Sequence, residues 1–174
     1  MDNQNFTNAP GSKLYDIPIT VRRAKIEDLD AVIELASETI VYSISPYRYI
    51  IPELAKTYRK NDLRTLRQMF DSPNLGIFVA ETQEGEFVGH IIMVVNLTDS
   101  LIGEIISMIV DISVKKEYWG SKAGELLCKQ AEAFARGNEM KYIELGVTTS
   151  NKRALRFYEK MGYLEERKRM IKQI

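Results

Sequence analysis

The feature that most constrains the fold is a strand–helix–strand–helix pattern in the second half of the chain. The apolar run 104–114 (EIISMIVDISV) predicts a buried strand, and an amphipathic helix follows over 120–137. The run 141–147 then predicts another strand, and 151–162 predicts a short helix. Apolar strands that alternate with amphipathic helices require a sheet on which those helices pack.

The ends and the buried face of these two helices follow from single residues. We expect Gly137 to cap the end of the first helix, Asn151 to cap the start of the second, and Gly162 to end it. The apolar stripe of the first helix consists of Leu126, Leu127, Ala131, Phe134 and Ala135.

The first half of the chain contains further helix patterns. Pro52 suits the first turn of one helix, and Asn61 or Asp62 is expected to cap a short third helix. The face that this third helix buries would hold Leu63, Leu66 and Phe70. An earlier apolar stripe at helical spacing is formed by Leu29, Val32, Ile33, Ala36 and Ile40.

Strand patterns complete the reading. The β-rich run 17–23 comes first, and the runs 76–82 and 87–96 are joined by the turn QEGE, which predicts an antiparallel hairpin. We expect 163–174 to form a last strand. The order of elements predicts a mixed α/β sheet with helices on both faces.

Length and composition limit the classes of protein to consider. The chain has 174 residues, and we expect a flexible N-terminal arm over 1–15 and a single domain over 16–174. Lys and Arg together number 24, as do Asp and Glu, and this balance disfavours a nucleic-acid partner. One Cys and one His exclude a disulfide framework and a Cys/His zinc site, so we expect no bound metal. No apolar run approaches the ~18–20 residues that span a bilayer, and the polar N-terminus does not resemble a signal peptide. We therefore expect a cytoplasmic protein without a membrane partner.

The segment 112–124 (ISVKKEYWGSKAG) joins a strand to a helix through a turn that contains glycine. Unpaired backbone N–H groups and the helix dipole at such a turn suit a phosphate or pyrophosphate. The same pattern also occurs as ordinary turn chemistry, so this segment alone does not define a ligand.

The segment 143–163 closely resembles the GNAT N-acetyltransferase superfamily. Its residues at the family's spacing are Val147, Asn151, Ala154, Tyr158, Gly162 and Tyr163. At the upstream turn Val114 and Gly124 also match, but Trp119 stands where Arg or Gln is usual and Lys122 where a central glycine is usual. The resemblance covers residues 20–174 and implies a mixed, mostly antiparallel sheet.

This resemblance implies that acetyl-CoA binds where two parallel strands, 104–114 and 141–147, splay apart. The pantetheine would bond the edge of the first strand, as an added strand does, and the pyrophosphate would rest on the turn amides. Trp119 would either line the cofactor or pack the turn, and Lys122 would either pair with a phosphate or remain solvated. The implied cofactor-binding residues are Ile112, Ser113, Val114, Trp119, Gly120, Ser121, Lys122, Ala123, Gly124, Asn151, Arg153 and Tyr158.

The resemblance also implies a general acid, Tyr158, whose phenol protonates the sulfur of the departing CoA. An amine acceptor must lose a proton before it attacks, and Glu104, Asp111 and Glu144 are the candidate bases, each acting through water. His90 in its strand pattern is more often structural, and Cys128 lies inside a helix, where nothing lowers its pKa.

The acceptor itself stays open at this point. A protein N-terminal α-amine is the first hypothesis, although Gly146 stands where enzymes of that type often carry Glu or His. A small amine or polyamine is the alternative, and a CoA-binding sensor or interaction domain without catalysis is the alternative of another class. Only 12 residues follow Gly162, so the acceptor site would be open, or completed by the N-terminal arm or by a second subunit of a homodimer.

Overall fold

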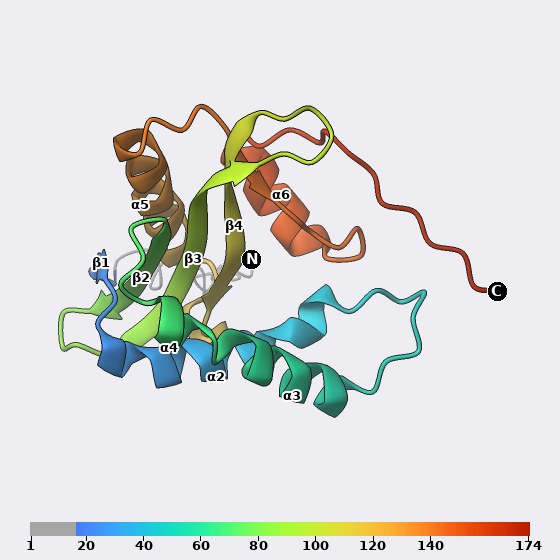
Figure 1. Ribbon diagram of the computed structural model, residues 1–174. Coiled ribbons are helices and arrows are strands. Elements are labelled where there is room, and N and C mark those ends of the chain that lie inside the picture. The colour runs from blue at the N-terminus through green and yellow to red at the C-terminus, as the bar shows by residue number, and fades with distance from the viewer. Residues whose placement is uncertain (1–16) are drawn as a thin grey trace, which may run out of the picture.

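The computed structural model describes residues 17–174, so the arm predicted over 1–15 lies outside the described residues. Its centre is one sheet with the strand order β1-β2-β3-β4-β5, in which only β4 and β5 run parallel. Figure 1 labels β1 to β4 of this sheet. The strands are β1 (Ile19–Arg23), β2 (Leu75–Thr82), β3 (Phe87–Thr98), β4 (Ile105–Val114) and β5 (Ile143–Leu145).

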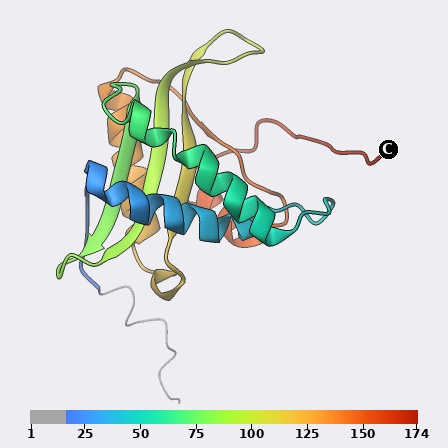
Figure 2. The same ribbon diagram turned by 60° about the horizontal axis from the view of Figure 1, so that its bottom comes forward.

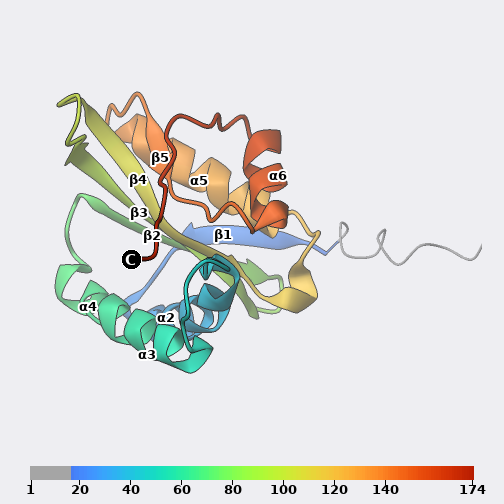
Figure 3. The same cartoon turned by 90° about the vertical axis from the view of Figure 1, so that its right-hand side faces the viewer.

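Helices cover both faces of this sheet. The α-helices are α2 (Leu29–Thr39), α3 (Pro52–Leu63), α4 (Leu66–Met69), α5 (Ala123–Gly137) and α6 (Lys152–Lys160). Short 3-10 helices occur at η1 (Ile26–Asp28), η2 (Ile40–Ser43) and η3 (Lys116–Tyr118). Figure 2 shows α2, α3 and α4 in front of the sheet, and Figure 3 shows α5 and α6 on the opposite side. The predicted mixed sheet with helices on both faces is therefore confirmed.

Side chains along the central strands point alternately to the two faces of the sheet, and this divides the core into two halves. Phe78 and Ala80 of β2 pack into the cluster beneath α5, whereas their neighbours Ile77 and Val79 pack into the cluster beneath α2. Successive strand residues point to opposite faces, so a strand covered on both sides reads as a continuous apolar run. This explains why β2 and β3 are apolar almost throughout.

Several predicted helix ends are also confirmed, and others are wrong. The Asn151 side chain accepts a hydrogen bond from the Ala154 amide and caps α6, and Gly162 follows the helix with φ +88°. Gly137 is instead the last helical residue of α5, and the left-handed conformation falls on Glu139, with φ +61°. The cap of α4 is Thr65, because Asn61 and Asp62 lie within the last turn of α3.

The prediction of a strand over 163–174 is wrong. Residues 163–174 form no helix or strand, and Leu164, Met170 and Ile174 are almost fully exposed. The reason is visible in the sequence, because the charged run 165–169 (EERKR) offers no alternating apolar face to a sheet. The segment is instead held by an ion pair between Arg167 and Asp99, with 2.7 Å between Nη1 and Oδ2.

No helix among residues 17–174 is long and apolar enough to cross a membrane.

Candidate active site

The site forms where β4 and β5 part. The parallel pairing joins Ser107–Ile109 to Ile143–Leu145 and goes no further, although β4 continues to Val114. Beyond Ile109, the edge of β4 that faced β5 has no strand beside it, and a cavity of about 320 Å³ opens between the two chain segments. This is the splayed pair of parallel strands that the family resemblance implied.

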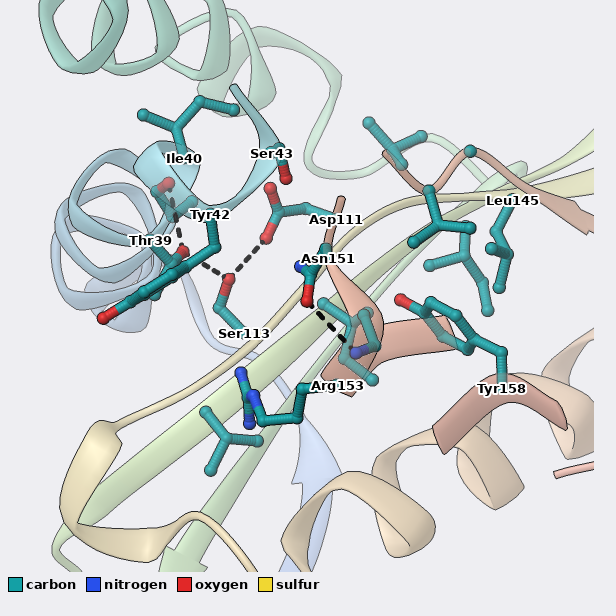
Figure 4. A pocket seen from close by; sticks show the side chains of 18 of the residues that line it. Thr39, Ile40, Tyr42, Ser43, Asp111, Ser113, Leu145, Asn151, Arg153 and Tyr158 are labelled. Atoms are coloured by element: carbon teal, nitrogen blue, oxygen red, sulfur yellow. Dashed lines mark hydrogen bonds between the residues drawn. The ribbon is translucent and has the colours of Figure 1, made fainter. Parts of the chain in front are cut away.

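The structure brings part of the predicted site together around this cavity (Figure 4). The predicted residues that line it are Asp111, Ile112, Ser113, Val114, Asn151, Arg153 and Tyr158. Glu104, Glu144 and residues 119–124 do not line it. The far wall comes from the end of α2, from η2 and from α3, through Thr39, Ile40, Tyr42, Ser43 and Arg59. The sequence analysis missed this wall, because these residues carry no motif.

Tyr158 extends from α6 into the cavity, on the side opposite Thr39 and Tyr42 (Figure 4). Its ring contacts Phe157 and Tyr163 edge to face, with centroid distances of 5.4 and 5.7 Å. Burial raises the pKa of the Tyr158 phenol well above its ordinary value, Cys128 and Asp111 add to this, and Arg153 opposes it. The hydroxyl is therefore protonated at neutral pH and can donate a hydrogen bond into the cavity.

Asp111 is held on several sides at once. Its Oδ2 accepts from Nη2 of Arg59 at 2.7 Å, and its Oδ1 accepts from Ser113 Oγ at 3.0 Å and contacts His90 Nε2 at 2.9 Å. Burial alone would raise the pKa of this carboxyl. Its hydrogen bond and electrostatic interaction with His90, followed by those with Arg59, outweigh burial and lower the pKa to about 2. A carboxylate with such a low pKa is a poor general base at neutral pH.

The other proposed bases lie outside the cavity. Glu144 of β5 pairs with Met108 of β4, and Glu104 precedes β4 at the end where the two strands are paired. His90 is completely buried, and its ring stacks against Phe87 with an interplanar angle of 9°, as expected of a structural histidine. The buried thiol of Cys128 has its pKa raised to about 12 by desolvation, which makes it a poor nucleophile.

Arg153 lines the cavity and lies against Trp119, which is outside the lining. The indole Nε1 of Trp119 donates to the carbonyl of Val114 at 2.8 Å, which packs the turn onto the end of β4. The Arg153 guanidinium lies 3.5 Å from the centroid of the same ring, and Tyr42 meets that ring edge to face at 5.2 Å. Within residues 17–174 no carboxylate forms an ion pair with Arg153, so this oriented cation is available to an anion.

The turn before α5 explains the departures from the family pattern. Gly120 adopts φ +90°, which a side chain rarely tolerates, whereas Lys122 has φ −77° and needs no glycine. A Cβ at Gly124 would lie 3.3 Å from the Phe157 ring, so this glycine permits α6 to approach α5. Backbone conformation therefore explains Gly120, packing against α6 explains Gly124, and nothing in the backbone requires a glycine at Lys122.

The chain belongs to the acetyltransferase (GNAT) family, whose sequence pattern matches residues 40–163. It is therefore an acyltransferase, as the resemblance of 143–163 predicted.

Individual relatives agree with this assignment. An uncharacterised N-acetyltransferase of Methanocaldococcus jannaschii is 26% identical over 160 residues, which are 89% of this chain and 67% of that protein. The structure of an acetyl transferase from Pyrococcus furiosus is 27% identical, covers 90% of this chain and 99% of its own, and gives a TM-score of 0.73. A GCN5-related N-acetyltransferase from Ralstonia eutropha shares the fold at 17% identity and a TM-score of 0.70, over 90% of this chain and 98% of its own.

Among residues 17–174, no group of three or more His, Cys, Asp and Glu side chains is placed to hold a metal ion.

Proposed function

We propose that the protein transfers an acetyl group from acetyl-CoA to an α-amino group, such as the N-terminus of a peptide, in the cavity between β4 and β5. The thioester end of the cofactor enters the splay, and the pantetheine bonds the free edge of β4 at Ile112 and Val114. The pyrophosphate rests on the 119–124 turn, with Asn151 and Arg153 nearby. The unpaired β4 edge and the unneutralised Arg153 support this placement.

The reaction is a direct transfer. The neutral amine attacks the thioester carbonyl, and a backbone N–H of β4 stabilises the oxyanion that forms. The carbon–sulfur bond then breaks, and Tyr158 gives its proton to the thiolate. The attacking nitrogen releases its own proton to water, and the Tyr158 phenolate regains a proton from water. Tyr158 suits this part because its hydroxyl faces the cavity and is protonated at neutral pH, so it can donate a hydrogen bond to the sulfur as negative charge develops there.

The choice of an α-amine rests on the titratable groups of the cavity. Among the described residues, its lining contains two tyrosines, two arginines and one aspartate, and no histidine, glutamate or lysine. Phenols and guanidiniums are protonated at neutral pH, and Asp111, with its pKa of about 2, cannot take a proton from an ammonium efficiently. The cavity therefore offers no effective base.

An acceptor for such a site must already be partly neutral in solution. An α-amino group titrates near ~7.7–8.0, whereas a lysine or polyamine nitrogen titrates near ~10.4 and is almost entirely charged at pH 7.5. A polycation would also seek several carboxylates, and the only one in the described lining is Asp111, which Arg59 and His90 already engage. Both arguments favour the α-amine over the small amine or polyamine.

The pH dependence of turnover tests this choice. With a peptide acceptor, kcat/KM should rise tenfold per pH unit below about pH 7.5 and level off above about pH 8.5. Above that pH almost all of the peptide's α-amine is already in its neutral, reactive form. An enzyme base would give a rise governed by its own pKa and independent of the acceptor. Two peptides whose α-amines differ in pKa distinguish these cases: the midpoint must follow the peptide, and a fixed midpoint contradicts the proposal.

A substitution of Arg153 tests the placement of the cofactor. Replacing Arg153 with Gln removes a guanidinium held against Trp119, so the Kd for CoA should rise by ~10-fold or more if it meets a phosphate. The effect should diminish at high salt. Lys152→Gln is the matched control, because this neighbouring cation is exposed and does not line the cavity. Equal effects of the two substitutions in a CoA titration would show that Arg153 acts only through net charge.

A homodimer that completes the acceptor side stays a prediction. The exposed apolar side chains Leu164, Met170 and Ile174 of the C-terminal segment support it.

A further inference from the structure

Arg59 is an unusual residue for the helix that carries it. Helix α3 buries only Leu63, and surface ion pairs of Lys56 with Glu38 and Lys60 with Glu34 join it to α2. In contrast, the side chain of Arg59 is only 14% exposed and reaches the wall of the cavity. A mostly buried arginine side chain on a largely solvated helix is expected to have a specific partner.

The partner is one short piece of β4. Nη2 of Arg59 donates both to the carbonyl oxygen of Val110 at 3.1 Å and to Oδ2 of Asp111 at 2.7 Å, while Nη1 meets Asp62 at 2.9 Å. A single guanidinium therefore holds a backbone group and the next side chain of the same strand. Both β4 contacts come from the single atom Nη2, and a lysine ammonium lies one bond nearer the backbone, so it would reach both acceptors only if α3 or β4 shifted.

This piece of β4 is a β-bulge. Ile92 of β3 pairs with Asp111 and Met93 pairs with Ile109, so Val110 is the extra residue that has no partner in the register. The bulge comes directly after Ile109, where pairing with β5 stops and the cavity begins. A bulge redirects the backbone and side chains beside it, and bulges recur next to active sites for this reason.

We propose that Arg59 is a positioning residue for acetyl transfer: by holding Val110 and Asp111 together it fixes the β4 bulge, and with it the β4 backbone groups that face the reacting thioester. On its other side the bulge is held by the contact of His90 with Asp111 and by two linked hydrogen bonds. Ser113 donates to Asp111, and the hydroxyl oxygens of Ser113 and Thr39 are 2.7 Å apart (Figure 4). Arg59 contacts the bulge from α3, in the wall of the cavity opposite Tyr158. It acts through β4 and does not itself enter the chemistry.

The test compares Arg59→Met and Arg59→Lys with the control Asp62→Asn. Asp62 is the exposed partner of Arg59 and lies outside the cavity lining, so its substitution should leave turnover within about twofold. Arg59→Met should lower kcat by ~10- to 100-fold, because a displacement of about 1 Å at a reacting group has effects of this size. The Kd for CoA should change by less than about threefold, because the residues proposed to bind CoA follow Val110 and Asp111 in the sequence and do not contact Arg59.

Arg59→Lys keeps the charge but shortens the side chain by one bond, so it cannot hold both Val110 and Asp111 without a shift of the backbone; kcat should fall by about tenfold, and CoA affinity should again stay unchanged. This variant retains a cation beside Asp111, so it still tests the positioning role of Arg59 if Arg59→Met does not fold. The measurements use whichever acceptor the wild-type protein acetylates fastest, so they stand even if that acceptor is not an α-amine. Normal kcat in Arg59→Lys, or parallel losses of kcat and CoA affinity, would overturn the proposal.

Discussion

Replacing Tyr158 with Phe should lower kcat by ~10²-fold or more and leave CoA binding almost unchanged. The substitution keeps the ring and its edge-to-face contacts with Phe157 and Tyr163, and removes only the proton donor that faces the cavity. The loss should appear in kcat, because the proton moves only as the thiolate leaves. Steady-state kinetics and a CoA titration on the same preparation measure both quantities.

Tyr163→Phe is the matched control for this experiment. Its hydroxyl is buried and has no hydrogen-bond partner within the described part of the chain, and the residue does not line the cavity. Removing a buried hydroxyl without a partner should leave folding stability unchanged or slightly higher. Near-normal kcat in Tyr158→Phe, or a similar loss of kcat in both variants, would show that Tyr158 is a packing residue and not the proton donor.

A methyl group at Gly89 should damage both the fold and the cofactor site. A Cβ there would lie 2.5 Å from the carbonyl oxygen of Ser113 and 3.0 Å from Cα of Val114, so the backbone of β4 must shift. Overpacking of this kind costs about 1–3 kcal/mol of stability. Because the displaced residues are those proposed to bond the pantetheine, CoA affinity should also fall by ~10-fold. Thermal unfolding with and without CoA measures the two effects.

Gly137→Ala is the control for Gly89→Ala. It lies in the last turn of α5, and nothing within 4 Å would meet its Cβ. Alanine in a helix is favoured over glycine, so this substitution should raise stability by ~0.5–1 kcal/mol and leave CoA binding unchanged. A Gly89→Ala variant as stable as the wild type would show that β3 and β4 can separate more easily than their contacts indicate.

The layered fold was predictable because its elements carry local signals. Continuous apolar runs marked β2, β3 and β4, the apolar stripe marked α5, and the Asn151 side chain marked the start of α6. The C-terminal strand was not a valid prediction, since the charged run 165–169 lacked the alternation that a strand needs. The end of α5 was misplaced because a glycine is a frequent but not an obligatory cap.

Only one side of the candidate site could be predicted. The turn and α6 carry family-like spacing, so Val114, Asn151 and Tyr158 were found from the sequence. The opposite wall of the cavity depends on contacts between distant residues, such as Arg59 and Asp111, which are 52 positions apart. The bulge at Val110 depends on the register between β3 and β4, and no residue type in the sequence marks it.

The most direct test of the account is an acceptor panel with acetyl-CoA at pH 7.5. The panel contains peptides with different first residues, the same peptides with blocked α-amines, spermidine and free lysine, and both CoA thiol release and product mass are measured. The account predicts acetylation of a free peptide α-amine with kcat/KM at least ~10-fold above that of spermidine, no reaction of the blocked peptides, and acetylation of free lysine on its α-nitrogen. Preferential acetylation of spermidine or of the lysine ε-amine, or CoA binding without any acetylated product, would contradict it.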